Sequence, residues 1–124
     1  MSDSDENLGC LTTHVLDTAL GRPARDLKIS LFSVRDDNKH IITSDVTNID
    51  GRLAKPILDG KDFKVGTYEL SFDVLSYFEA KHKLNKLTVF YKKISIGFHI
   101  NNAFEHYHVP LLLSPFGYTT YRGS

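Results

Sequence analysis

The chain has 124 residues, of which 41% are hydrophobic and 24% charged, a balance typical of one globular domain. Fifteen Lys and Arg residues offset fifteen Asp and Glu residues, so there is no net field to attract nucleic acid or an anionic membrane. No stretch approaches the roughly 20 apolar residues of a membrane-spanning helix. We therefore expect a soluble protein that binds neither nucleic acid nor membranes.

The first nine residues are polar and partly acidic. Secretory signals and transit peptides avoid acidic residues, and the final Arg-Gly-Ser is not the Ser-Lys-Leu peroxisomal address. We expect residues 1–9 to be disordered, residues 10–124 to form the folded domain, and the compartment to be the cytoplasm or the peroxisome. Cys10 is the single cysteine, so an internal disulfide is excluded. A nucleophilic thiol needs a nearby base or cation, and since Cys10 directly follows the disordered segment, we expect it to be inert.

Residues 11–18 have the pattern of a strand that carries a histidine. Successive side chains of a strand point to opposite faces, so His14 and Val15 face opposite sides. Val15 is the natural core residue, and His14 therefore points away from the core. Taken alone, His14 is simply a surface histidine.

The next expected strand, at residues 27–31, alternates between apolar and polar side chains, as half-buried strands do. Further along, the Asp50-Gly51 pair is the strongest two-residue signal for a tight turn. Arg52 follows this turn, so its side chain begins the next strand close to the turn. Taken alone, such an arginine is a solvated or salt-bridged surface residue.

Two more alternating segments, residues 68–74 and 94–100, indicate further half-buried antiparallel strands. Between them, residues 74–82 place apolar side chains at helical offsets among good helix formers, which predicts a helix of about two turns. Seven or eight short strands, frequent turns and one short helix predict an all-β fold. The specific expectation is a two-sheet antiparallel β-sandwich of about eight strands.

The strand expected at residues 106–113 carries two histidines on its outer face. His106 and His108 share this face with Pro110 and Leu112, while the opposite face is uniformly apolar and must be the core side. Proline within a strand is confined to an edge or to a position without a ladder hydrogen bond. An outer face that mixes imidazoles with leucine is better explained as an interface or a ligand groove than as a solvated wall.

These groups could support two kinds of chemistry if they converge. Histidine titrates near neutral pH and can exchange a proton with water, and a guanidinium offers a fixed fork of donors to a planar anionic group. His14, Arg52 and His108 could therefore activate a water molecule and hold a charged heterocycle. His14, His106 and His108 could instead bind zinc, because His-x-His with a distant third histidine is a known ligand spacing. The residues alone leave both alternatives open.

Five motifs together form a pattern that spans nearly the whole chain after residue 9. They are Leu-Thr-Thr-His-Val-Leu-Asp-Thr (11–18), Gly-Arg-Pro-Ala (21–24), Asp-Gly-Arg (50–52), His-Tyr-His-Val-Pro-Leu-Leu-Leu-Ser-Pro (106–115) and Tyr-Arg-Gly-Ser (121–124). In this pattern the chain resembles the 5-hydroxyisourate hydrolases, the transthyretin-like enzymes of purine degradation. The terminal tetrapeptide is the most specific motif, because transthyretin itself lacks it. Transthyretin also has other residue types at the positions of His14, Arg52 and His108.

The resemblance implies an enzyme that hydrolyses 5-hydroxyisourate to 2-oxo-4-hydroxy-4-carboxy-5-ureidoimidazoline in urate degradation. It implies no metal or organic cofactor, and a homotetramer built as a dimer of dimers with active sites between the dimers. The alternative is a transthyretin-like small-molecule carrier without catalysis.

The resemblance also assigns roles to individual residues. His14, Arg52 and His108 match the catalytic trio, in which histidine activates water and arginine stabilises the substrate. Tyr121 and Ser124 match residues that close the pocket and bind substrate together with His14 and Arg52. His106 matches less directly, and we expect it to support the trio without touching the substrate.

Overall fold

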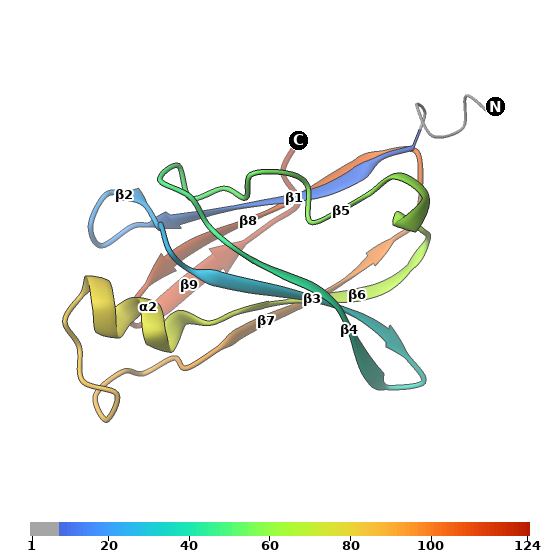
Figure 1. Ribbon diagram of the computed structural model, residues 1–124. Coiled ribbons are helices and arrows are strands. Elements are labelled where there is room, and N and C mark those ends of the chain that lie inside the picture. Colours follow the sequence, from blue (N-terminus) through green and yellow to red (C-terminus); the bar gives the residue numbers. More distant parts are fainter. Residues whose placement is uncertain (1–7) are drawn as a thin grey trace.

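Two β-sheets face each other across a shared apolar interior, and the computed structural model describes residues 8–124 (Figure 1). The larger sheet has the strand order β2-β1-β8-β9, with β5 also paired to β1, and the smaller sheet has the order β4-β3-β6-β7. The described residues thus form a β-sandwich with a single α-helix, as predicted. The elements are β1 (Cys10–Asp17), β2 (Arg22–Pro23), β3 (Lys28–Arg35), β4 (Asn38–Val46), β5 (Leu58–Asp59), the short 3-10 helix η1 (Gly60–Asp62), β6 (Gly66–Phe72), α2 (Val74–Lys81), β7 (Ile94–Ile100), β8 (His106–Ser114) and β9 (Gly117–Thr120).

One strand pair departs from the antiparallel prediction. β1 and β8 run parallel over their whole shared length, from Cys10 opposite His106 to Asp17 opposite Leu113, whereas the other strand pairs are antiparallel. The chain between β1 and β8 forms β2, β5 and the whole of the smaller sheet, and it then returns so that both strands start at the same end of the larger sheet (Figure 1). An alternating pattern reports only which face is buried, and it cannot tell the two directions apart.

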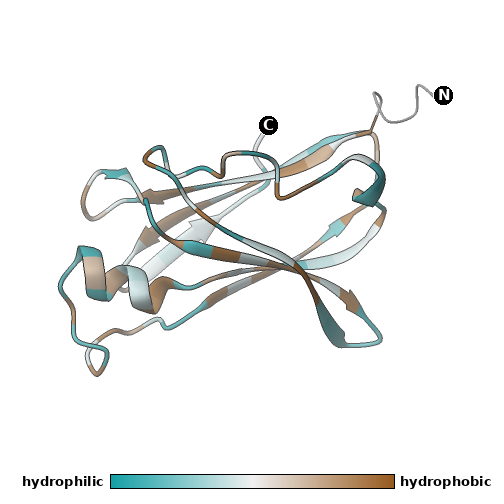
Figure 2. Cartoon of the chain, in the orientation of Figure 1, coloured by the Kyte–Doolittle hydropathy of each residue, from teal (hydrophilic) through white to brown (hydrophobic). Residues whose placement is uncertain are grey.

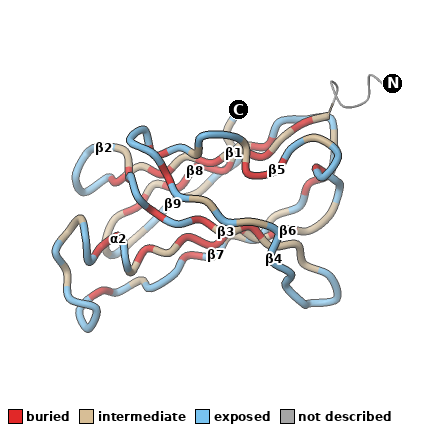
Figure 3. Tube along the Cα trace, viewed as in Figure 1, coloured by how far each residue is buried: buried red, intermediate tan, exposed pale blue. Residues whose placement is uncertain are grey.

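The predicted inner and outer faces of these two strands are confirmed. Along β1 every second residue is buried, starting at Leu11, and His14 lies on the opposite, outer face. Along β8 the buried residues include Tyr107 and Leu111, with His108 facing outward, but Pro110, predicted on the outer face, is also buried. Figures 2 and 3 show the same alternation in hydropathy and in burial along the strands. Full burial of such a side chain stabilises the fold by roughly 1.5–3 kcal/mol, so the inner faces hold the strands in this register.

The folded part begins slightly earlier than predicted. Gly9 is buried, and its amide donates a hydrogen bond of 2.7 Å to the carbonyl oxygen of Ala103. A Cβ atom at Gly9 would lie 1.7 Å from the Glu105 carbonyl oxygen, so only glycine fits there. Residues 1–9 were predicted to be disordered, and residues 1–7 of this segment lie outside the described part of the chain.

The predicted helix is confirmed as α2, and it is fastened to the end of β1. Asp73 caps the helix by accepting a hydrogen bond from the Ser76 amide. Val74, Tyr77 and Phe78 form its buried face. Within residues 8–124, the helices are too short or too polar to cross a lipid bilayer.

A buried carboxylate, not anticipated from the sequence, joins α2 to β1. One oxygen of Asp17 accepts hydrogen bonds from the Ala19 and Leu20 amides, at 3.0 and 2.9 Å. The other oxygen accepts from the Tyr77 hydroxyl at 2.7 Å and from Nε2 of His82 at 2.6 Å. Burial raises the pKa of Asp17, but the hydrogen bonds from Tyr77, Leu20 and His82 outweigh this effect and hold the pKa below its ordinary value. The carboxylate is therefore ionised in the folded protein near neutral pH.

Replacing Asp17 with asparagine should lower the free energy of unfolding by about 2–4 kcal/mol at pH 7, because the charged acceptor of buried hydrogen bonds is lost. Since the folded-state pKa is depressed, the wild-type advantage exists above the unfolded pKa of about 4 and is lost as the pH falls further. Urea unfolding at fixed protein concentration measures both effects. The matched control is Asp36→Asn, in an exposed turn. Equal stability of the two variants at pH 7 would contradict the expectation.

Candidate active site

The pairing of β1 with β8 places two imidazoles on one surface. His14 and His108 both point to the outer face of the larger sheet, from adjacent parallel strands. Thr12 lies directly opposite His108, and Pro110 lies opposite His14. The two histidines are therefore diagonal neighbours: they are 94 positions apart in the chain but lie on adjacent strands, offset by two residues.

Arg52 reaches the same place through a tight turn. The Asn48 side chain accepts hydrogen bonds from the amides of Asp50 and Arg52, at 2.9 and 3.2 Å, and closes the turn. Gly51 has a φ of +74° and lies so close to β1 that a Cβ atom there would be 2.4 Å from the Val15 carbonyl oxygen. This close approach requires glycine, and it lets Arg52 form an isolated antiparallel bridge with His14.

The surroundings of His14 fix which nitrogen can accept a proton. Its Nε2 lies 3.0 Å from the carbonyl oxygen of Asp50. A carbonyl oxygen only accepts, so Nε2 carries the hydrogen and Nδ1 of the neutral ring keeps a lone pair. Burial and the nearby Arg52 guanidinium lower the pKa of His14. The ring is therefore neutral at pH 7 and can act as a base.

His108 is held in a related way. Its Nδ1 and the Thr12 hydroxyl oxygen are 2.8 Å apart. This hydrogen bond occupies one side of the ring and leaves Nε2 free for chemistry. Burial, Arg52 and His14 all lower the pKa of His108. Arg52 thus acts electrostatically on both imidazoles, and the three predicted side chains form one cluster outside the core.

A pocket of about 220 Å³ opens next to Arg52, between β1 and the chain after Arg52, and of the three clustered side chains only Arg52 lines it. Its lining includes Thr12, Arg52 and Lys55. It is smaller than the roughly 300–1,000 Å³ of a drug-sized ligand site, and its two cationic side chains suit a small electron-rich compound. The arrangement combines two neutral bases with positive charge beside a small pocket.

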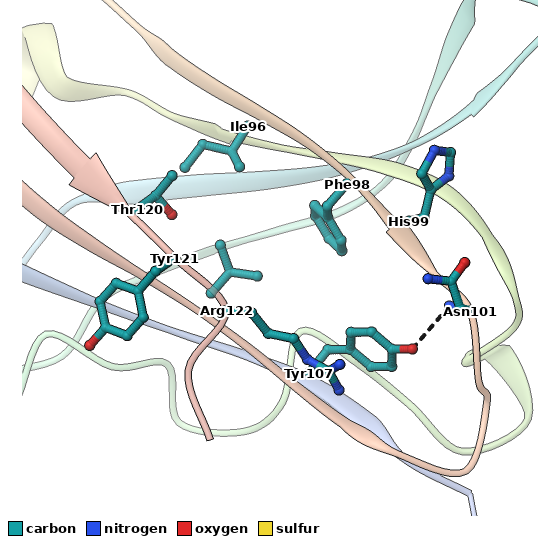
Figure 4. Close-up of a pocket in the computed structure, with 9 residues that line it drawn as sticks. Ile96, Phe98, His99, Asn101, Tyr107, Thr120, Tyr121 and Arg122 are labelled. Atoms are coloured by element: carbon teal, nitrogen blue, oxygen red, sulfur yellow. Dashed lines mark hydrogen bonds between the residues drawn. The ribbon is translucent and has the colours of Figure 1, made fainter.

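The remaining predicted site residues lie near the cluster but do not join it through hydrogen bonds. Within residues 8–124, no hydrogen bond links Tyr121 or Ser124 to His14, Arg52 or His108. Tyr121 is 55% exposed, and it points in a different direction from Arg122 beside a second pocket of about 210 Å³ (Figure 4).

The geometry bears on the possible zinc site of the three histidines and on the reactivity of Cys10. In the described part of the chain, no three His, Cys, Asp or Glu side chains come close enough to hold a metal ion, so His14, His106 and His108 do not form a zinc site within one protomer. His106 is exposed, two positions from His108. Burial and the Asp59 carboxylate raise the pKa of the Cys10 thiol, which disfavours a reactive thiolate.

Sequence reasoning missed two contributors to this site, the Thr12 hydroxyl and the Asp50 carbonyl oxygen. Thr12 shares the outer face with His14, which the alternation predicts, but its contact with His108 depends on the parallel register. No pattern in the sequence reports that register.

Comparisons with known proteins agree with the fold and identify the family. Residues 11–123 match the HIUase/Transthyretin family. The chain is 51% identical over 116 residues to 5-hydroxyisourate hydrolase 2 of Rhizobium meliloti, covering 94% of this chain and 97% of that protein. It is 42% identical over 123 residues to 5-hydroxyisourate hydrolase of Pseudomonas aeruginosa, covering 99% and 98%.

Solved structures with the same fold include two enzymes and a transthyretin. The structure of 5-hydroxyisourate hydrolase from Klebsiella pneumoniae superimposes with a TM-score of 0.75 at 31% identity, covering 94% of both chains. That of an (S)-allantoin synthase gives 0.87 at 43% identity over 94% of this chain, which spans only 44% of the synthase. Sea bream transthyretin in complex with thyroxine gives 0.80 at 28% identity, covering 91% and 93%.

Replacing Thr12 with valine should change the tautomer populations of His108, because the shape is kept while the partner of Nδ1 is lost. Long-range nitrogen–proton NMR spectra of the imidazole report the tautomers directly. Thr67→Val is the matched control, since the Thr67 hydroxyl makes the same kind of contact, at 3.0 Å, with Nδ1 of His99 on the other sheet. An unchanged His108 spectrum in the Thr12 variant would show that this hydrogen bond does not orient the ring.

Proposed function

The chain belongs to the HIUase/Transthyretin family, and we propose that it hydrolyses 5-hydroxyisourate to 2-oxo-4-hydroxy-4-carboxy-5-ureidoimidazoline in urate degradation. The observation that carries this proposal is the convergence of His14, Arg52 and His108 on one outer face beside a small pocket. Relatives that match the chain over almost their whole length are hydrolases of this compound. An enzyme with two neutral imidazoles and a guanidinium has the groups that this hydrolysis needs.

In the proposed mechanism, an imidazole removes a proton from water as the water oxygen attacks the ring carbonyl carbon of an amide-type bond. The bond from this carbon to the ring nitrogen then breaks, and the proton passes to the departing nitrogen. The carbonyl carbon becomes the carbon of the carboxyl group, and the released nitrogen becomes the terminal nitrogen of the ureido group. Nδ1 of His14 and Nε2 of His108 are the atoms free for this transfer, because the other nitrogen of each ring is hydrogen-bonded.

Arg52 has two roles in this mechanism. Its guanidinium binds the electron-rich oxygens of the substrate and stabilises the negative charge that grows on the carbonyl oxygen during attack. It also lowers the pKa of both histidines, which keeps them unprotonated and able to accept a proton. One cation thus serves both the substrate and the bases.

We propose that the active protein is a homotetramer, a dimer of dimers, with each site completed by a second copy. Leu16 and Leu112 lie on the same outer face as the histidines and are only partly buried in one protomer. Exposed aromatic side chains gather near β9, where Phe116 is 74% exposed and contacts Phe90. Apolar surface of this kind favours association. In such an assembly Tyr121 and Ser124 close the pocket and contact substrate, and His106 supports the trio from the same face.

The carrier alternative has less support. A carrier needs no proton acceptor in its binding channel, yet this chain has two imidazoles and an arginine there. The chain is also 51% and 42% identical to two hydrolases, but only 28% identical to the transthyretin in complex with thyroxine. We propose the cytoplasm as the compartment, with the peroxisome as the alternative. No cofactor takes part in the proposed mechanism.

Activity is tested by mixing the protein with 5-hydroxyisourate made freshly by urate oxidase and following its ultraviolet absorbance. The wild-type protein should accelerate the decay well above the rate in buffer. His108→Ala should lower turnover by roughly 10²–10⁴, the usual contribution of a general acid or base, and Arg52→Glu should also lose activity because the charge is reversed.

Decay no faster than in buffer would favour the carrier. An unchanged rate in His108→Ala, with intact oligomers, would remove His108 from the mechanism. Loss of wild-type activity after chelation, with bound zinc found by elemental analysis, would favour the zinc alternative.

The pH dependence should reflect the lowered pKa values of the two histidines. A base works only when unprotonated, so kcat/KM, corrected for the reaction in buffer, should stay level from pH 8 to about 6.5, the pKa of an ordinary histidine. It should fall only at lower pH. In Arg52→Gln, loss of the nearby cation should raise both histidine pKa values, which NMR titration can follow without activity. A wild-type profile that already falls below pH 7.5 would contradict the lowered pKa values.

A further inference from the structure

The C-terminal tail lies directly against the strand that carries His108. β9 pairs with β8 from Ser114 opposite Gly117 to Leu111 opposite Thr120. The pairing of β8 with β9 stops after Thr120. The next residue of β8 is Pro110, which has no amide hydrogen and cannot donate the next backbone hydrogen bond. The tail then returns in the same register, as an isolated bridge between His108 and Gly123. The Gly123 amide donates to the His108 carbonyl oxygen at 2.7 Å.

Gly123 faces the imidazole ring of His108. Residues directly opposite each other in an antiparallel pair point to the same face, so any side chain at 123 would share the outer face with this ring. A Cβ atom there would lie 2.6 Å from Cδ2 of His108 and 3.3 Å from Cγ of Pro110. The first contact is far shorter, and the second slightly shorter, than the 3.5–4.0 Å optimal separation of non-bonded carbon atoms. Glycine is required here for space, since its φ is not in the left-handed region.

Arg122 holds the tail from the opposite face. Its guanidinium carbon lies 4.1 Å from the centroid of the Tyr107 ring. Figure 4 shows the two side chains next to each other. Nη2 donates to the His106 carbonyl oxygen at 3.1 Å and lies 3.4 Å from the Glu105 carboxylate. The ring beneath it is itself fixed, because the buried Tyr107 hydroxyl accepts hydrogen bonds from two backbone amides, at 3.0 Å each. Arg122 therefore attaches the tail to the residues just before His108.

We propose that Arg122 and Gly123 are positioning residues for His108: Arg122 keeps the tail in register on β8, and Gly123 leaves the space that the imidazole occupies. Thr12 holds the Nδ1 edge of the ring, and the tail borders its Cδ2 edge. The ring is thus confined at Nδ1 and at Cδ2, the carbon that is bonded to Nε2. This inference rests on the proposed function only where it concerns catalysis, because the geometry of the ring can be measured by itself.

The experiment combines NMR of selectively labelled histidine with kinetics on Gly123→Ala and Arg122→Lys. Gly97→Ala is the glycine control, because a Cβ atom at Gly97 in β7 meets nothing within 4 Å. Arg25→Gln is the arginine control, because it removes an ion pair of the same 3.4 Å length without a ring contact. Circular dichroism and oligomeric state establish that each variant folds and assembles.

In Gly123→Ala the His108 ring signals should move, and kcat should fall about 10²-fold with KM changed by less than about threefold, the typical cost of misplacing a catalytic group by roughly 1 Å. Arg122→Lys should show smaller changes of the same kind, since lysine keeps the charge but not the planar stacking. Both controls should resemble the wild type. His108 signals and kcat in Gly123→Ala that match those of Gly97→Ala would overturn the proposal. Moved His108 signals in a protein that has no hydrolase activity would support the positioning role while refuting the proposed function.

Discussion

In the larger sheet, β1 and β8 run parallel with Thr12 opposite His108, and the relative position of the two imidazoles follows from this register. A shift by one residue would turn every side chain of a strand to the other face, moving the imidazoles inside and the apolar residues out. The inner faces prevent this shift, because Leu11, Val15 and Leu111 are fully buried. The hydrophobic interior therefore specifies the chemistry on the outer surface, although no core residue takes part in it.

The cluster on that surface is electrostatically unusual, because a guanidinium stands beside two imidazoles. Burial lowers the pKa of His14 and of His108, and repulsion by the Arg52 guanidinium acts in the same direction, so both rings stay neutral. Hydrogen bonds to the Asp50 carbonyl and the Thr12 hydroxyl then orient the two rings. Positive charge for an anionic transition state and lone pairs for proton transfer can thus exist side by side at neutral pH.

Two glycines let separate pieces of chain approach this sheet closely enough to contribute. Gly51 brings the turn that carries Arg52 against β1, and Gly123 brings the C-terminal tail against β8. Both sites lack room for a Cβ atom, but only Gly51 also has a positive φ. At the far end of β1, the buried Asp17 ties the strand to α2 through Tyr77 and His82. The scaffold beneath the site is therefore held at several points by specific polar contacts as well as by apolar packing.

The sequence by itself determined which residues face inward, where the helix forms, and that His14 and His108 lie on outer faces, because alternation and helical spacing are local properties of the chain. Its motifs also identified the family and placed Arg52 just after a tight turn. The tertiary structure alone decided that β1 and β8 are parallel neighbours, that Thr12 meets His108, and that the tail returns over it. These contacts join residues about 15 to 96 positions apart. Their existence depends on how whole sheets pack, which a periodic pattern of burial does not encode.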